Sequence, residues 1–85
     1  MREHIDKWVR DVVLEALEDT ICISKDSIAM QHDILRDLKM NSDDASFEFI
    51  PSIERRLDID IPESEWLKAT TVGEVIELVK KYKMT

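Results

Sequence analysis

The side chain best suited to covalent chemistry in this 85-residue chain is the hydroxyl of Ser42, in the segment Asn41-Ser42-Asp43. The segment precedes a helical pattern, and Ser, Asn and Asp are all favoured helix N-caps, whose side-chain oxygen accepts a hydrogen bond from a backbone amide. The unpaired amides and the dipole at a helix start also stabilise an anion, so a serine carrying a phosphate ester suits the same position. The segment therefore fits either a structural cap or a modified serine.

The other chemistry-bearing residues form no recognisable site. The two histidines, His4 and His32, lack a cysteine or carboxylate partner at metal-ligand spacing, so zinc is weakly supported. Asp37, Asp43 and Asp44 lack the twelve-residue loop with a turn glycine that binds calcium. A single glycine excludes a glycine-rich phosphate loop, and no strand-turn-helix elbow exposes a nucleophile. We expect no metal site and no catalytic residues.

Negative charge is concentrated in one part of the chain. The formal net charge is -7, and ten acidic against four basic residues between Asp33 and Glu65 place -6 of it in that segment. Such a segment is either a solvated face or a docking surface for partners with basic patches. It argues against nucleic acid, including a DNA-binding role for the last helix, and against an anionic membrane surface.

The single cysteine, Cys22, excludes an intramolecular disulfide and a multi-cysteine metal site, and favours a reducing compartment. We interpret Cys22 as a small hydrophobic core residue. The chain begins with charged residues and has no apolar run as long as a signal core or a membrane span. We expect a cytoplasmic monomer.

The low glycine and proline content favours helices over hairpins. An apolar stripe from Ile5 to Leu17 predicts a first helix over about 3–18. The stretch from 19 to 42 shows no period and reads as a long loop pinned by apolar anchors, which is unusual in a small domain. Those anchors are Ile23, Ile28, Ile34, Leu35 and Leu38.

A second helical pattern has apolar residues in steps of three and four from Phe47 to Leu57, with Asp43 and Asp44 ahead of it where negative charge favours a helix start. Pro51 lies inside this pattern. Proline lacks the amide donor and clashes with the carbonyl four residues back, at a cost of about 3 kcal/mol in a regular helix interior. We expect a kink or an irregular first turn.

The remaining chain predicts one more main helix. Residues 59–62 read as extended because the proline biases the preceding residue away from helical angles, and a short helical turn is expected over 63–68. Thr71 and Glu74 form a capping box, which predicts a helix from Val72 to about Tyr82. The sequence thus predicts an all-α domain of three main helices and a short fourth.

Together these segments resemble the acyl carrier proteins, small acidic helical bundles that carry acyl groups on a 4′-phosphopantetheine arm attached to a serine. Residues 23–28 are similar to the loop anchor that follows the family's first helix, and Asp37-Leu38 to the Asp-Leu that precedes the serine by four residues. Residues 57–62 and 70–75 resemble the segments after the second helix and at the start of the last. The resemblance implies one acyl-carrier-like bundle over residues 1–85.

The register of the modified serine depends on the direction of counting. Where the family has Asp-Ser-Leu, this chain has Asn41-Ser42-Asp43. Counting forward from Leu38 places the serine at Ser42, whereas counting backward from Pro62 places it at Asp43. The counts differ by one inserted residue. If the insertion follows Ser42 the serine survives, and if it precedes Ser42 then Asp43 has replaced it and no arm can be attached.

The resemblance implies a carrier without catalysis of its own. Ser42 would accept 4′-phosphopantetheine from a basic phosphopantetheinyl transferase, and the arm's thiol would hold an acyl thioester for enzymes of fatty-acid, polyketide or related specialised synthesis. The core is expected to loosen between the helices and shelter the acyl chain. Four apolar residues of the helical stripes are its expected lining, with plain core packing as the alternative for each of them. They are Phe47, Ile50, Val72 and Ile76.

Partner docking is expected on the second helix and its head. Glu48 and Glu54 match acidic docking positions of the family, and Arg55 and Arg56 stand where the family usually has more acid, which implies specialised partners with basic docking patches. The alternative is a degenerate carrier fold without the arm. It would act as an acidic protein-interaction module, with Asp43, Asp44 and Glu48 as its recognition charges.

Overall fold

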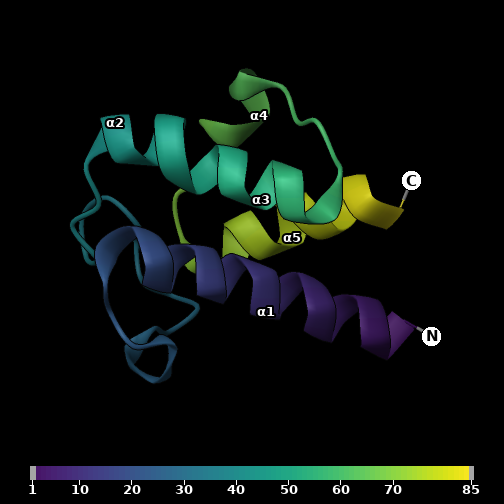
Figure 1. Ribbon diagram of the computed structural model, residues 1–85, viewed down its shortest axis with the longest axis horizontal. Coiled ribbons are helices and arrows are strands. Elements are labelled where there is room, and N and C mark those ends of the chain that lie inside the picture. The colour runs from purple at the N-terminus through teal and green to yellow at the C-terminus, as the bar shows by residue number, and fades with distance from the viewer. Residues whose placement is uncertain (1, 85) are drawn as a thin grey trace.

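Helices make up most of the structure. The computed structural model describes the backbone of residues 2–84 and the side chains of residues 6–83 (Figure 1). Among these residues the only β-type pairing is an isolated bridge between Asp33 and Thr71, so the all-α expectation is confirmed. In chain order the elements are α1 (Arg2–Ile21), the 3-10 turn η1 (Lys25–Ser27), α2 (Ser42–Asp44), the π-helical turn η2 (Ala45–Phe49), α3 (Ile50–Leu57), α4 (Glu63–Trp66) and α5 (Val72–Met84).

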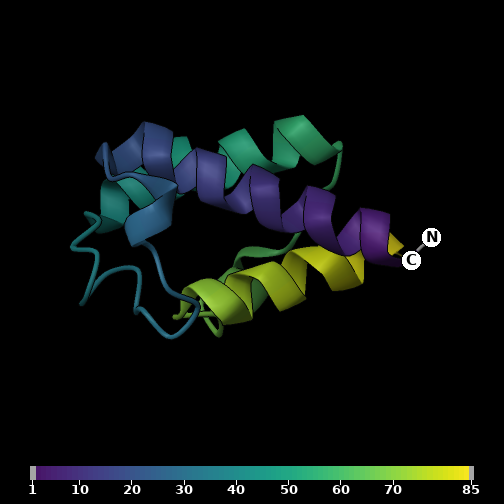
Figure 2. The same ribbon diagram turned by 90° about the horizontal axis from the view of Figure 1, so that it is seen from below.

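Three helical rods surround the core. α2, η2 and α3 follow one another as a single rod, hereafter the second rod, which runs beside α1, while α5 packs against α1 (Figures 1 and 2). The largest fully buried side chains come from all three rods: Val9, Val13 and Leu17, Ile53 and Leu57, and Val72, Val75 and Val79. No helix within residues 2–84 is both long enough and apolar enough to span a bilayer.

α1 is about one turn longer than its apolar stripe predicts, ending at Ile21 rather than near residue 18. Cys22 then adopts a left-handed φ of 58° and its amide donates to the Glu18 carbonyl at 2.8 Å, which closes the last turn. Cys22 is exposed at this position. The interpretation of Cys22 as a core residue is therefore wrong, because the extra turn carries it past the buried stripe.

The long loop after α1 is tied to the start of α5. The Ile34 amide donates to the Thr70 carbonyl at 2.9 Å, and the Gly73 amide donates to the Met30 carbonyl at 2.9 Å. A Cβ at residue 73 would lie 3.3 Å from that Met30 oxygen, so a glycine suits this close approach. The loop is thereby held against the bundle by backbone hydrogen bonds as well as by side chains.

The apolar anchors of the loop are largely as predicted. Ile28, Ile34 and Leu38 are buried and Ile23 is partly buried against the core. Leu35 is 52% exposed, so it is not an anchor. Its backbone amide is instead held by the Asp33 carboxylate at 3.0 Å, in a turn that directs the side chain outward.

α5 begins with the predicted capping box. The Glu74 amide donates to Thr71 Oγ1 at 3.1 Å, and the Thr71 amide donates to Glu74 Oε1 at 3.0 Å. Thr70 donates to the same carboxylate oxygen through its amide and its hydroxyl. The backbone bond from Thr71, followed by the bonds from Thr70, lowers the pKa of Glu74 from its ordinary value. The backbone amides of residues 71–74 therefore all have acceptors, and the predicted start at Val72 is confirmed.

Candidate functional site

Ser42 is the first residue of the second rod, and the residue before it supplies the cap. Asn41 has extended angles, φ -70° and ψ 140°, and its Oδ1 accepts a hydrogen bond from the Asp43 amide at 2.8 Å. Ser42 is exposed, and its hydroxyl has no hydrogen-bond partner among the described residues. The structural cap and the reactive hydroxyl are thus divided between two neighbouring residues.

A π-helical turn follows within the same rod. The Ile50 amide donates to the Ala45 carbonyl, five residues back instead of the four of an α-helix. Such a turn holds one more residue than an α-helical turn. Pro51 comes next, at the start of α3, where its missing amide leaves no α-helical bond to break. The irregularity expected at Pro51 is confirmed, and it takes the form of a π turn.

The π turn and the helical phase decide which aromatic residue of the rod meets the core. Phe49 is 2% exposed and forms one face with Ile53 and Leu57, whereas Phe47 is 77% exposed. Steps of four residues turn a side chain by about 40°, but two successive steps of three turn it by about 120° in the other direction. Phe47 and Ile50, which precede Ile53 in steps of three, therefore lie off the buried face. The prediction that Phe47 belongs to the buried stripe is wrong.

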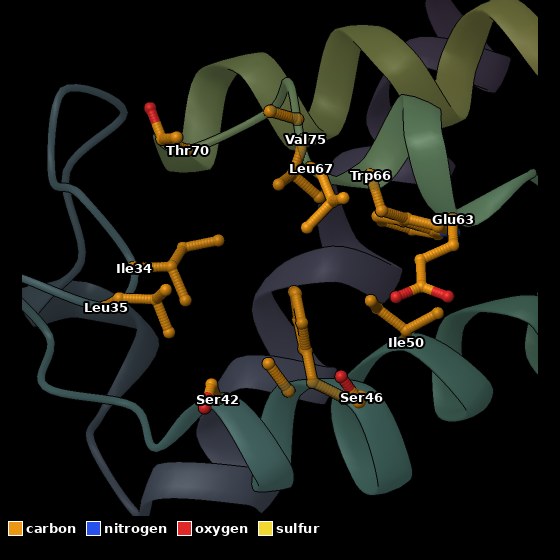
Figure 3. Close-up of a pocket in the computed structure, with 13 residues that line it drawn as sticks. Ile34, Leu35, Ser42, Ser46, Ile50, Glu63, Trp66, Leu67, Thr70 and Val75 are labelled. Atoms are coloured by element: carbon orange, nitrogen blue, oxygen red, sulfur yellow. The ribbon is translucent and has the colours of Figure 1, made fainter.

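An apolar cavity of about 160 Å³ lies beside Ser42. Figure 3 shows Ser42 and Ser46 on the second rod, with Trp66 and Leu67 across the cavity from them. Ile34 from the loop lies on a third side. The residue that begins the rod thus stands at the edge of a hollow with mainly hydrocarbon walls.

Of the four residues predicted to line a cavity, Ile50 does so here. Val72 is fully buried in the core, Ile76 is 8% exposed away from this cavity, and Phe47 lies on the outer surface. Val72 and Ile76 are thus core residues, the alternative that an apolar stripe allowed, whereas the placement of Phe47 is wrong; α4 and the residue after it cover this side of the rod, leaving Val75 as the contribution of α5.

Trp66 in α4 is a lining residue that the sequence indicated only as part of a short helical turn. Its side chain is 7% exposed, and Nε1 is buried without a hydrogen-bond partner among the described residues. A tryptophan within the short helical turn predicted over 63–68 was the signal available in the sequence. Its isolation from acceptors depends on how α4 packs, which local sequence does not show.

The predicted docking acids divide into two groups. Asp43, Asp44 and Glu48 are exposed on the second rod. Glu54 is partly buried and its Oε2 accepts a hydrogen bond from the Ile61 amide at 3.0 Å, so it holds the extended segment after α3 against the rod. The first three acids point to solvent, while Glu54 has an internal role.

The two arginines also differ. Arg56 Nη2 lies 2.7 Å from Asp19 Oδ2, and its Nη1 lies 3.4 Å from Glu15 Oε1, so Arg56 joins α3 to α1. Arg55 is exposed in the last turn of α3. Of the pair, Arg55 is the one whose charge is presented outward.

A second hollow on the second rod has the exposed residue Phe47 among its lining residues. It encloses about 490 Å³, and its apolar walls include Ile50 and Ile61. Four carboxylate residues also line it: Asp43, Glu54, Asp60 and Glu63. This hollow thus combines an exposed aromatic residue with carboxylates, a combination not predicted while Phe47 was placed in the buried stripe.

Of the two histidines, only the side chain of His32 belongs to the described residues. His32 Nδ1 accepts a hydrogen bond from the Ala29 amide at 3.0 Å, and the side chain of His4 lies outside the described residues. Among the described side chains, no three His, Cys, Asp or Glu residues are arranged to hold a metal ion.

Comparison with known proteins agrees with this arrangement. Residues 11–79 match the family model described as the phosphopantetheine attachment site. The chain is also 28% identical over 79 residues to an acyl carrier protein of Picosynechococcus sp., covering 93% of this chain and 91% of that relative. An acyl carrier protein of Campylobacter fetus subsp. fetus is 30% identical over 71 residues, covering 84% of this chain and 86% of that relative.

A third relative, an acyl carrier protein of Clostridium perfringens, is 29% identical over 72 residues, with 85% of this chain and 93% of that relative covered. The fold, the exposed serine and these matches define a carrier protein. The chain belongs to the phosphopantetheine attachment-site family, as the resemblance implied. The prosthetic group of this family is covalently attached phosphopantetheine, which confirms the expected cofactor.

Proposed function

We propose that this chain is a single-domain acyl carrier whose 4′-phosphopantetheine arm is attached to Ser42. The observation that carries the proposal is the division of roles at the head of the second rod. Asn41 accepts the capping hydrogen bond, so the Ser42 hydroxyl is exposed and uncommitted. In the transfer, Ser42 Oγ attacks the pantetheine-bearing phosphorus of coenzyme A and forms a P–O bond, while its proton passes to a base of the transferase. The P–O bond of the pyrophosphate bridge breaks, and adenosine 3′,5′-bisphosphate leaves.

The position of the π turn supports Ser42 over Asp43 as the attachment point. The forward and backward counts differ by one residue, and a π turn accommodates one residue more than an α-helical turn. This turn spans Ala45–Phe49, after Ser42. An insertion absorbed there leaves the forward count from Leu38 to Ser42 intact.

The adjoining cavity supports a role in sheltering the cargo. The arm supplies a terminal thiol that holds the acyl group as a thioester. The chain's own residues bind and exclude water: Ile34, Ile50 and Leu67 contribute apolar walls next to Ser42. A chain lying against these walls is removed from water, which is favourable for its hydrocarbon part.

The outward-facing acids support docking to partners with basic patches. These partners are a phosphopantetheinyl transferase and acyl-handling enzymes of fatty-acid, polyketide or related specialised synthesis. Asp43, Asp44 and Glu48 would meet basic side chains, and the exposed ring of Phe47 suits an apolar pocket at the centre of the contact. Arg55 would be repelled by a uniformly basic surface, which supports specialised partners. No catalytic role is proposed, and the monomeric state and cytoplasmic location remain predictions.

A second candidate is an acidic interaction module without the arm. Asp43 favours it, because this charged residue stands next to Ser42 where the family has an apolar residue that packs into the core. In this case the exposed acids and Phe47 would bind the partner, and no acyl group would be carried. Partner binding would then be sensitive to salt and independent of Ser42.

The decisive experiment is intact mass measurement after incubation with coenzyme A and a broad-specificity phosphopantetheinyl transferase. We expect wild type to gain the mass of one arm, Ser42→Ala to gain none, and the matched control Ser46→Ala to gain one arm, since Ser46 is exposed one turn along the same rod. No gain by wild type under conditions that load a standard carrier protein would sink the proposal.

The interaction module makes a different prediction. The double variant Asp43→Asn/Asp44→Asn should weaken partner binding measured at low salt, and the difference from wild type should shrink as salt rises. Equal binding by wild type and the double variant would exclude these two aspartates as recognition charges.

A further inference from the structure

The cavity beside Ser42 has an enclosed inner part and an open outer part. Its inner walls are apolar side chains that are only 2–7% exposed and come from the loop, the second rod, α4 and α5: Ile34, Phe49, Trp66 and Val75. Leu35 and Leu67 also line the cavity but are 52% and 74% exposed, so they lie where it opens to solvent (Figure 3). A hydrocarbon group that enters past the two leucines is thus enclosed by the buried walls.

The volume of the cavity limits how many carbons it can enclose. It measures about 160 Å³. A protein cavity of about 150 Å³ with apolar walls holds one benzene molecule, which corresponds to about six carbons. The buried walls belong to the hydrophobic core, and a close-packed core resists the movement that a larger cavity would need. The cavity therefore encloses about six carbons, and further carbons must lie outside it.

The lining also restricts the charge of the group. Glu63 is the one ionisable side chain among the lining residues, and it is exposed. The Thr70 hydroxyl lies at the edge and already donates to Glu74 Oε1 at 3.0 Å. A carboxylate on the cargo would meet hydrocarbon walls and the like charge of Glu63, with no basic side chain in the lining to compensate it. The cavity thus suits an uncharged chain.

We propose that the cargo is a short, uncharged hydrocarbon acyl group of about six to eight carbons, with about six carbons enclosed and the thioester end near Leu35 and Leu67. This inference rests on the carrier function proposed above, and it names the substrate class. Each enclosed methylene leaves water and favours the folded state. In a longer chain the additional methylenes stay in water and contribute nothing.

A series of acylated forms of the whole chain tests the length limit. Butyryl, hexanoyl, octanoyl and dodecanoyl coenzyme A serve as donors for a broad-specificity phosphopantetheinyl transferase, and intact mass confirms that Ser42 is loaded. Chemical denaturation then gives the folding equilibrium constant of each form relative to the protein that carries the arm alone.

We expect this constant to rise about two- to fourfold for each added methylene as far as hexanoyl or octanoyl. From octanoyl to dodecanoyl it should change by no more than the effect of one methylene. A rise that continues at the same rate to dodecanoyl, or equal constants for all four forms, overturns the proposal.

The adipoyl form is the control for charge. Adipoyl has as many carbons as hexanoyl and ends in a carboxylate, so it should stabilise the folded protein less than hexanoyl does. Equal stabilisation by the two groups would contradict the preference for an uncharged chain.

Two variants shorten the cavity from different sides. Ala45 and Ala69 both line it and are half-buried, and Ala45→Leu or Ala69→Leu adds about three carbons to the lining. The chain length at which the folding constant stops rising should fall by about three carbons in each variant. Ala29→Leu is the matched control, because Ala29 is half-buried and lies outside the cavity.

The outcomes separate this inference from the carrier function. An unchanged length limit in both filling variants, or the same shift in Ala29→Leu, overturns the inference. Loading of Ser42 without any length limit overturns the inference alone, whereas the absence of a mass gain overturns the carrier function as well.

Discussion

Two helix starts of this protein, at α5 and at the second rod, each have a hydroxyl side chain but use it in opposite ways. At α5, Thr71 and Glu74 satisfy each other reciprocally, and the threonine hydroxyl both donates and accepts. At the second rod, Asn41 accepts the capping bond and the Ser42 hydroxyl is left exposed. A hydroxyl at a helix start is thus structural where it caps, and open to chemistry where a neighbour caps in its place.

The two helix starts also differ in how tightly their surroundings are packed. The first residue of α5, Val72, is fully buried, and the loop before it is held by backbone hydrogen bonds. Ser42 stands beside a cavity, and a π turn follows it. One start is closed by its contacts, whereas the other keeps both space and an unpaired hydroxyl, as a site for covalent attachment requires.

The largest expected effect is on α5. Thr71→Ala removes the capping oxygen and should lower the free energy of unfolding by about 0.5–2 kcal/mol. Ser42→Ala removes no hydrogen bond seen here and should stay within about 0.5 kcal/mol of wild type. Chemical denaturation of both variants measures the difference. Equal losses would mean that Ser42 is also structural, and the contrast between the two starts would fail.

The next effect concerns Asn41. Asn41→Ala should cost up to about 1 kcal/mol, because the Asp43 amide loses its partner. We also expect slower arm loading, because the Ser42 hydroxyl becomes the nearest capping oxygen. Asn41→Asp is the control, since it keeps a capping oxygen. Denaturation and the rate of mass gain give the two readouts, and unchanged values of both in Asn41→Ala would contradict the role of Asn41.

Pro51 tests the irregular turn near the serine. The proline stands in the first turn of α3, where it restricts the unfolded chain and breaks no α-helical bond, so Pro51→Ala should lower the free energy of unfolding by about 0.4–1 kcal/mol. Ser52→Ala, at the next position, is the control for substitution in this turn. A clear gain in stability of Pro51→Ala would mean that the proline strains the rod.

The smallest effect is on the pH dependence of stability. Because hydrogen bonds lower the pKa of Glu74 in the folded state, its contribution is fully present above its ordinary pKa of 4.5 and is lost as pH falls through the lower folded value. Glu74→Gln keeps an acceptor and removes the titration. Its stability should fall less steeply than that of wild type below pH 4.5 in denaturation curves. Parallel profiles would show that the carboxylate charge adds nothing to the cap.

Structural features that depend on residues close together in the sequence could be predicted. The capping box at Thr71 and Glu74 and the irregularity at Pro51 depend on residues within one turn, so their sequence was sufficient. Phe47 was misplaced because its burial depends on the phase of a rod that contains a π turn. Cys22 was misplaced because α1 continues one turn beyond its apolar stripe.

The candidate site was only partly predictable. Ser42 and its acidic neighbours were identified from type and position, but the sequence offered Asn41, Ser42 and Asp43 equally as caps. Contacts between distant segments were not visible either. The hydrogen bond that the Ile61 amide donates to Glu54 and the cavity wall formed by Trp66 both depend on how the chain returns after α3.

The sequence by itself determined the helical class, the acidic character, the α5 cap and the segment that holds the serine, because helix periodicity, capping and charge act between near neighbours. Only the tertiary structure decided that Asn41 caps while Ser42 remains open, that Phe47 faces solvent, and that Trp66 contributes a wall of the cavity beside the serine. These outcomes depend on the packing of the rods and α4, which joins residues far apart in the chain and sets which polar groups are left unsatisfied.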